Sequence, residues 1–133
     1  MSDKKYLKTR LQSIQFALEG IKYVFITQQN ARIHAGFTLA VLILGFIVRI
    51  SRMEWIGLLL TIGLVWAAEL LNTAVEIMMD IVAPEQNPAV KIGKDVSAGG
   101  VIVSAFISIV VGLLIFGPPL WGWITGIFSH LFQ

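Results

Sequence analysis

The first part of the chain, about residues 5–27, alternates apolar and polar residues at the spacing of an α-helix. Its apolar side recurs at alternating intervals of four and three residues: Leu7, Leu11, Ile14, Leu18, Ile21 and Phe25. Polar residues occupy the opposite side, and basic residues gather at the start of the segment. This pattern predicts an amphipathic helix that lies in a membrane interface.

Three long apolar stretches follow, at about residues 33–49, 54–82 and 96–116. The first is just long enough to cross the roughly 30 Å hydrocarbon layer of a bilayer. The second would form a helix about 42 Å long from Trp55 to Val82, so it must tilt or protrude into one interface.

Prolines predict where these stretches end. Pro84 and Pro88 predict a turn between the second and third stretches, because proline cannot continue a helix. Gly117-Pro118-Pro119 predict the end of the third stretch. Residues 117–133 are then a tail, which Trp121 and Trp123 place at the interface.

The composition supports an integral membrane protein. The 133 residues are 56% hydrophobic and 14% charged, with a mean hydropathy of +0.81, which is too apolar for a soluble domain of this size. The predicted fold class is therefore an all-α membrane protein, a single domain over residues 1–133. The chain has no cysteine, which excludes disulfides. We expect no cleaved signal peptide, because no apolar region occurs before about residue 35.

The distribution of Lys and Arg predicts how the spans are oriented. Eight basic residues lie in the N-terminal region and in the loop between the second and third spans, against two, Arg49 and Arg52, at the other side. The excess of positive charge places the N-terminus and residues 84–95 in the cytoplasm. The basic residues are not massed on one polar face, so we expect no nucleic acid as a partner.

The second span carries polar residues that have no favourable place in lipid. Glu69, Asn72, Glu76 and Asp80 fall within about 80° of one another on a helix, and we call them the polar stripe. An ionisable residue at mid-bilayer costs on the order of 3 kcal/mol. The polar stripe therefore predicts a shared polar site that faces other helices. Since three helices cannot enclose it, we expect the chain to oligomerise.

The depth of these residues suggests their chemistry. Counted from Trp55, Glu69 lies about 21 Å along the helix and Glu76 about 31 Å, near the cytoplasmic boundary. Such a layout can join a membrane-embedded molecule to a water-soluble one. Glu69 is the best candidate for a general base, and Glu76 suits a divalent cation held by oxygen ligands.

Lys91 and the pair Lys94-Asp95 occur where the third helix is expected to begin. A lysine beside a helix N-terminus can bind phosphate oxygens, so these residues favour phosphoryl transfer. Two other interpretations remain open from spacing alone. The polar stripe can line an ion or proton path, or it can be a polar interface that only holds subunits together.

The motif Glu69-Leu-Leu-Asn72-Thr-Ala-Val-Glu76, followed by Asp80, Lys94-Asp95 and Ala98-Gly99-Gly100, closely resembles the signature of the small prokaryotic diacylglycerol kinase/undecaprenol kinase family. The segment Asn30-Ala31-Arg32-Ile33-His34 also looks like the one that precedes the first span in that family. The likeness covers about residues 5–117 and leaves the tail outside.

The resemblance implies a homotrimer in the bacterial cytoplasmic (inner) membrane, with active sites shared between subunits. It implies transfer of the ATP γ-phosphate, with Mg²⁺, to the hydroxyl of a membrane lipid alcohol, either diacylglycerol or undecaprenol. Glu69 would be the catalytic base and Glu76 a metal ligand. The residues expected near the nucleotide are Asn72, Glu85, Asn87, Lys94 and Asp95. Those expected near the lipid substrate or its headgroups are Arg10, Arg32 and His34.

The chain departs from the family pattern at two positions. The family usually has a second metal-binding glutamate where this chain has Gln28, and a histidine where it has Asn87. A glutamine still offers a carbonyl oxygen to Mg²⁺, but without charge. We therefore expect weaker metal and ATP binding with activity retained. The alternatives are a catalytically impaired member with a structural role and a carboxylate-lined transporter subunit, which Lys94-Asp95 disfavours. The Leu-Leu-Asn-Thr form of the motif leans towards undecaprenol.

Overall fold

The structure is a computed structural model that describes the backbone of residues 3–83 and 87–131, and the side chains of residues 10, 12–83 and 87–127. It contains four α-helices: α1 (Asp3–Thr27), α2 (Gln29–Val48), α3 (Arg52–Val82) and α4 (Pro88–Leu131). No strand occurs among the described residues. The predicted fold class, one N-terminal helix followed by three long apolar helices, is confirmed.

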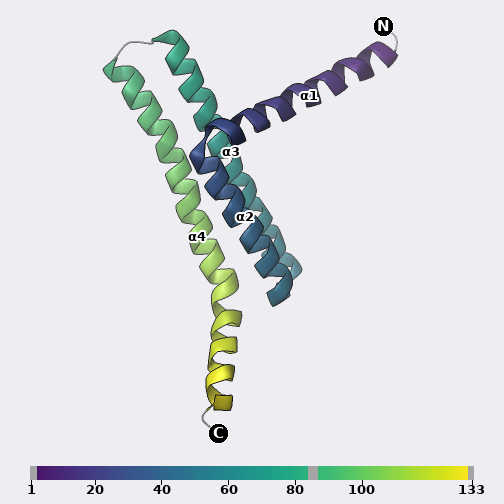
Figure 1. The fold of residues 1–133 in the computed structure, drawn as a ribbon, viewed down its shortest axis with the longest axis vertical. Coiled ribbons are helices and arrows are strands. Elements are labelled where there is room, and N and C mark those ends of the chain that lie inside the picture. The colour runs from purple at the N-terminus through teal and green to yellow at the C-terminus, as the bar shows by residue number, and fades with distance from the viewer. Residues whose placement is uncertain (1–2, 84–86, 132–133) are drawn as a thin grey trace.

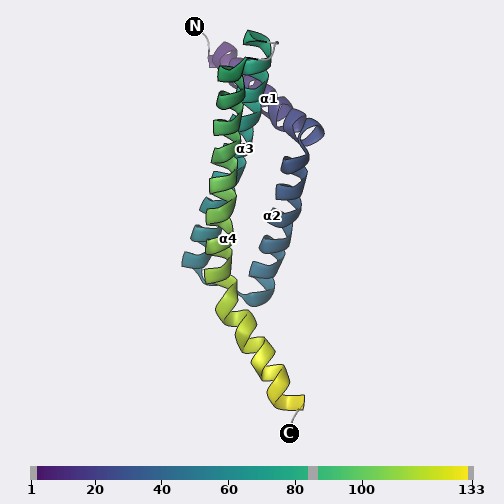
Figure 2. The ribbon, with the colours of Figure 1, turned by 90° about the vertical axis from the view of Figure 1, so that its left-hand side faces the viewer.

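Helices α3 and α4 run antiparallel and make the most extensive pairing in the molecule (Figure 1). Helix α2 lies beside them with fewer contacts to both, and α1 leaves the bundle at a steep angle (Figures 1 and 2). Only Gln28, in an extended conformation, separates α1 from α2. This arrangement brings the joint between α1 and α2 towards the middle of α3.

The connection between α2 and α3 is short and closely built. Arg49 ends α2 in the left-handed conformation, with φ of 59°. Ser51 and Glu54 form a capping box at the start of α3, in which each side chain bonds the other residue's backbone N–H. The Trp55 ring then lies against Gly45 of α2, where a Cβ atom would come within 3.0 Å of it. Close approach at Gly45 therefore holds this end of the α2–α3 pair together.

Three helical segments are long and apolar enough to cross a membrane: Gln29–Val48, Arg52–Val82 and Pro88–Ile127. A small apolar cluster of Leu58, Ile115 and Phe116 lies between α3 and α4. Most other large apolar side chains are exposed on the outside of these helices. That distribution is the one expected when lipid, rather than water, surrounds the protein.

The prediction that the third helix ends at Gly117-Pro118-Pro119 is wrong, because α4 continues through both prolines to Leu131. A proline inside a helix removes one hydrogen bond and crowds the carbonyl four residues earlier. In an apolar surrounding the remaining backbone groups have no water to bond, so a bent helix is more favourable than a broken one. Figure 2 shows this bend where α4 changes from green to yellow. The interfacial position of residues 117–133 remains a prediction.

Candidate functional site

The polar stripe begins on the buried side of α3. The buried residues of this helix recur at helical spacing: Leu58, Thr61, Val65, Glu69, Asn72 and Thr73. Glu69 is 1% exposed and Asn72 is 7% exposed, whereas Asp80, near the end of the helix, is exposed. The deeper part of the stripe faces other helices, as predicted. The argument that one chain cannot enclose it is wrong for Glu69 and Asn72, because helices of the same chain cover both.

The carboxyl group of Glu69 is buried without a complete set of partners. Its Oε2 atom makes no hydrogen bond to any group in the described part of the chain. The Thr73 hydroxyl donates to the backbone carbonyl of Glu69 at 3.0 Å, so it does not use the carboxyl group. His34 of α2 lies close enough to interact with Glu69 electrostatically. A buried polar atom without a partner is uncommon and points to a functional role.

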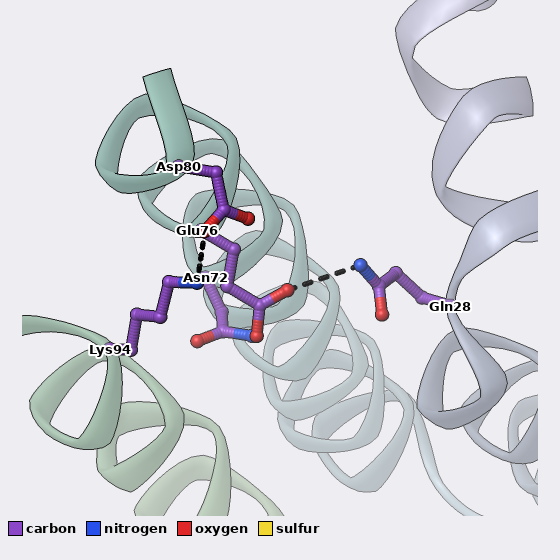
Figure 3. Close-up of polar contacts among 5 residues, drawn as sticks. All are labelled: Gln28, Asn72, Glu76, Asp80 and Lys94. Carbon is purple, nitrogen blue, oxygen red and sulfur yellow. Dashed lines mark hydrogen bonds and ion pairs between the residues drawn. The ribbon is translucent and has the colours of Figure 1, made fainter. Parts of the chain in front are cut away.

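Glu76 is the centre of a polar network one to two turns further along α3 (Figure 3). Its Oε1 atom accepts a hydrogen bond from the Asn72 amide at 3.0 Å. Its Oε2 atom accepts one from the Gln28 amide at 3.2 Å. The network therefore ties α3 to the joint between α1 and α2, over 48 residues of sequence.

Asp80 and Lys94 form an ion pair that links α3 to α4 (Figure 3). The prediction that Lys94 lies where the third helix begins is wrong, because α4 begins at Pro88 and Lys94 lies nearly two turns inside it. The free N–H groups of the helix N-terminus are therefore not beside Lys94. Its ammonium group instead pairs with the exposed Asp80, and Asp95, the next residue in the sequence, is exposed. Lys94 remains a candidate phosphate contact through its charge alone.

Ser97 joins this site, although the sequence analysis did not single it out. Its hydroxyl group lies 2.7 Å from the Asn72 carbonyl oxygen and 2.9 Å from the Lys94 carbonyl oxygen. The contact to Asn72 orients the amide so that its NH₂ group faces Glu76. Ser97 follows Lys94 by three residues and so shares its helix face, but this spacing alone does not single out a serine in a membrane helix.

Replacing Ser97 by alanine should disturb the site mildly. Without the hydroxyl group, the Asn72 amide loses one of the contacts that fix its orientation towards Glu76. For the Mg²⁺-dependent phosphoryl transfer that the family resemblance implies, we expect a two- to fivefold rise in the Mg²⁺ concentration needed for half-maximal activity, corresponding to a hydrogen bond of about 0.5–1 kcal/mol. A Mg²⁺ titration of activity measures this shift. Ser97→Thr keeps the hydroxyl group and should behave as the parent chain; an equal shift in both variants would refute the role.

The other predicted site residues lie around this network or away from it. Arg10 and Arg32 are exposed on α1 and α2, and His34 is half-buried. Asn87 caps α4, because its side-chain oxygen accepts the Ala89 N–H at 2.9 Å. The structure thus gives Asn87 a structural role, and its binding to a nucleotide remains a prediction. Glu85 lies outside the described residues.

The donor atoms around Glu76 fit one divalent cation bound together with phosphates. No group of three His, Asp or Glu side chains that could hold a metal occurs in the described ranges. Glu76 nevertheless offers two carboxylate oxygens, and rotation of the Gln28 amide would offer a third oxygen beside them. Mg²⁺ commonly binds one or two carboxylates and completes its shell with water and substrate phosphates. This pair is therefore suited to Mg²⁺ delivered with a nucleotide.

Two apolar cavities lie within one turn of Glu69 along α3. One, of about 440 Å³, lies between α1 and α3 and is lined by residues that include Tyr23 and Thr73. The other, of about 400 Å³, lies between α2, α3 and α4 and includes His34 and Val65. Cavities of this size and character are typical of sites for small or extended apolar ligands.

These features define an integral membrane protein in which a buried carboxyl group, flanked by apolar cavities, is connected by polar side chains to one end of the bundle. The family model of prokaryotic diacylglycerol kinase matches residues 15–116. The chain belongs to this family. It is a membrane lipid kinase, and the motif around Glu69, Asn72 and Glu76 lies within the matched region.

Three relatives show the same relationship. The chain is 43% identical over 109 residues to the undecaprenol kinase of Bacillus subtilis (strain 168), covering 82% of this chain and 89% of the relative. It is 37% identical to a diacylglycerol kinase of Synechocystis, covering 83% of this chain and 63% of the relative. It is 31% identical to the diacylglycerol kinase of Haemophilus influenzae, covering 80% and 91%.

Proposed function

We propose that the protein transfers the γ-phosphate of ATP to the hydroxyl group of a membrane lipid alcohol. The observation that carries this proposal is the position of Glu69. Its carboxyl group is buried among membrane-spanning helices with Oε2 unpartnered, and it lies at the inner end of the polar stripe that leads towards the α3–α4 loop. A base in this place can meet an alcohol from the lipid side and a phosphate from the water side.

In this proposal Glu69 accepts the proton of the lipid hydroxyl group. As that proton leaves, the lipid oxygen forms a bond to the γ-phosphorus of ATP, and the bond from this phosphorus to the bridging oxygen of ADP breaks. ADP leaves with the bonding electrons, and Glu69 later returns its proton to water. The unpartnered oxygen of Glu69 is free to receive the hydroxyl group without first breaking a hydrogen bond.

The residues nearer the end of α3 would hold the nucleotide. Lys94 would offer an ammonium donor on the more open side of the network, with the exposed Asp95 next to it in the sequence. Asn72 is buried and would act from deeper in the site, through the amide that now bonds Glu76. Glu76 and Gln28 would hold Mg²⁺. When bound, this ion neutralises charge on the phosphate oxygens and so favours transfer. Because Asp80 already pairs with Lys94, phosphate binding would compete with this ion pair.

We take undecaprenol as the acceptor, with diacylglycerol as the second candidate. The relative at 43% identity carries the name undecaprenol kinase, and the Leu-Leu-Asn-Thr motif leans in the same direction. Both lipids present a hydroxyl group near the interface and an apolar chain, and the apolar cavities within one turn of Glu69 along α3 offer a surface on which part of such a chain can lie.

The deciding experiment measures Mg²⁺-dependent transfer of labelled phosphate from ATP to undecaprenol and to diacylglycerol, side by side in mixed micelles. We expect faster transfer to undecaprenol. A preference for diacylglycerol would change the acceptor and keep the kinase. No transfer to either lipid by a folded protein would favour the impaired, structural alternative, for which the neutral Gln28 is the motivating observation.

We further propose a homotrimer in the bacterial inner membrane, with the N-terminus and the α3–α4 loop in the cytoplasm. The basic residues at that end of the bundle support this orientation. The exposed Asp80 and Asp95 support shared sites, because a neighbouring subunit would cover this open side. The mass of the protein in detergent, measured by light scattering with detergent subtraction, tests the trimer.

Replacing Gln28 by glutamate should lower the Mg²⁺ requirement. The new carboxylate would lie about 3 Å from that of Glu76, since the present amide donates to Glu76 at 3.2 Å. Two adjacent carboxylates repel each other until a cation binds between them. We expect at least a threefold lower Mg²⁺ concentration for half-maximal activity, measured by titration against Gln28→Asn as a neutral control. An unchanged requirement would remove Gln28 from the metal site.

A further inference from the structure

The C-terminal part of α4 is longer than a membrane span needs. Helix α4 has 44 residues, so it extends about 66 Å, more than twice the hydrocarbon layer. Its last part projects beyond the ends of α2 and α3, at the end of the molecule opposite to the α3–α4 loop (Figure 1). The family match ends at residue 116. Residues 117–131 are therefore an addition to the part that the family shares.

No charged residue occurs after Asp95. No charged side chain therefore marks a point at which the helix passes into water. The side chains beyond the prolines are also widely exposed in the single chain: Trp121 is 69%, Trp123 is 51% and Ile127 is 61% exposed. A straight continuation would carry this apolar surface into water, which the hydrophobic effect opposes.

The residues after the prolines nevertheless have two different sides. At 100° per residue, Gly122, Thr125 and Gly126 fall on one side, and Ser129 continues the same spacing in the sequence. Ile124 and Ile127 fall on the opposite side, with Trp121 and Trp123 at its two borders. The Thr125 hydroxyl group bonds carbonyls of its own helix, so it does not hold another element. The pattern is that of a helix between an apolar and a polar phase.

The two prolines mark the point at which the helix changes direction. Pro118 and Pro119 lack the N–H groups that would bond the carbonyls of residues 114 and 115. The helix bends at this level, and its last part turns away from the line of α4 (Figure 2). Trp121 and Trp123 follow directly, and tryptophan favours the boundary between lipid and water.

We propose that residues 120–131 form a second interfacial helix, on the membrane face opposite to α1, which lies flat with Ile124 and Ile127 in lipid and Thr125 towards water. It is the continuation of a membrane-spanning helix, so the lipid already in contact with α4 is its partner. Because this helix carries no charge, its seating does not depend on anionic lipid, in contrast to the basic α1.

Single cysteines test this placement without background, since the natural chain contains none. Thr125→Cys and Ile127→Cys are two residues apart, so on an upright helix they differ by only about 3 Å in height. On a flat helix they face opposite phases. The full-length variants are placed in phosphatidylcholine vesicles, with and without anionic phosphatidylglycerol, and treated with a membrane-impermeant maleimide. Arg52 is exposed where α3 begins. Labelling of Arg52→Cys therefore measures the fraction of protein molecules that have this end of the bundle on the outside of the vesicle.

We expect Thr125→Cys to react at least tenfold faster than Ile127→Cys, in both lipid compositions. Equal fast labelling would mean a helix in water, and equal protection would mean a helix that spans the membrane or is buried against another copy; either result overturns the proposal. Dependence on phosphatidylglycerol would also overturn it. If one variant fails to fold, Gly122→Cys replaces Thr125→Cys and Ile124→Cys replaces Ile127→Cys, with the same expected order.

Discussion

Replacing Glu69 by glutamine should remove phosphoryl transfer and leave the protein folded. Glutamine has the same shape, but its amide cannot accept a proton from the lipid hydroxyl group. Positioned general bases contribute about 10²–10⁴-fold to rate, so we expect kcat to fall by at least 100-fold. The KM for ATP should change little, because Glu69 lies about 10 Å along α3 from Glu76, where the nucleotide and its cation are expected.

Glu19→Gln is the matched control for this experiment. Glu19 is exposed on α1 and lies outside the proposed site, so the same chemical change there should leave kcat unaltered. Circular dichroism and gel filtration in detergent show whether each variant is folded. If Glu69→Gln retained more than a tenth of the parent kcat, another group would have to accept the proton, and the central assignment would be wrong.

Replacing Glu76 by glutamine should weaken the use of Mg²⁺. Glu76 accepts hydrogen bonds from two amides, Asn72 and Gln28. A glutamine amide would set one NH₂ group against another NH₂ group and would remove the negative charge that attracts the cation. We expect the Mg²⁺ concentration for half-maximal activity to rise about 10–100-fold, the range found when the surroundings of a bound metal are altered. Initial rates across a Mg²⁺ series at fixed ATP measure it.

The two substitutions are expected to differ in how they respond to excess metal. A raised Mg²⁺ concentration should restore much of the activity of Glu76→Gln, since binding is what it impairs. It should not restore Glu69→Gln, since that variant lacks the proton acceptor. Rescue of both variants, or of neither, would show that the roles of the two acids are not separate in the way proposed.

The hydrophobic pattern predicted the helices well because the lipid environment imposes simple constraints on a spanning segment. A spanning segment must be apolar and must satisfy its own backbone bonds, so α2 and α3 were visible in the sequence. The end of α4 was not, because Pro118 and Pro119 usually end a helix in water, whereas here the helix bends. Sequence rules for proline assume a solvent that can bond the freed carbonyls, and that solvent is missing inside a bilayer.

The sequence predicted those site residues whose side chains are energetically unfavourable in a membrane, and it did not predict those that a membrane helix tolerates easily. Glu69 and Glu76 stand out because a carboxyl group inside a membrane costs free energy and therefore indicates a function. Ser97 does not stand out, since a serine is inexpensive in a membrane helix, and its contact to Asn72 appears only in three dimensions. Asn87 shows the reverse difficulty. The family resemblance suggested a nucleotide contact, and the structure shows a side chain that caps α4.

Gln28 connects the position of α1 to the polar network around Glu76. It is the one residue between two helices, and the same residue touches Glu76. If α1 moves relative to α3, the Gln28 amide moves away from that carboxylate. The position of α1 and the arrangement of oxygen atoms at Glu76 are therefore coupled through this single residue.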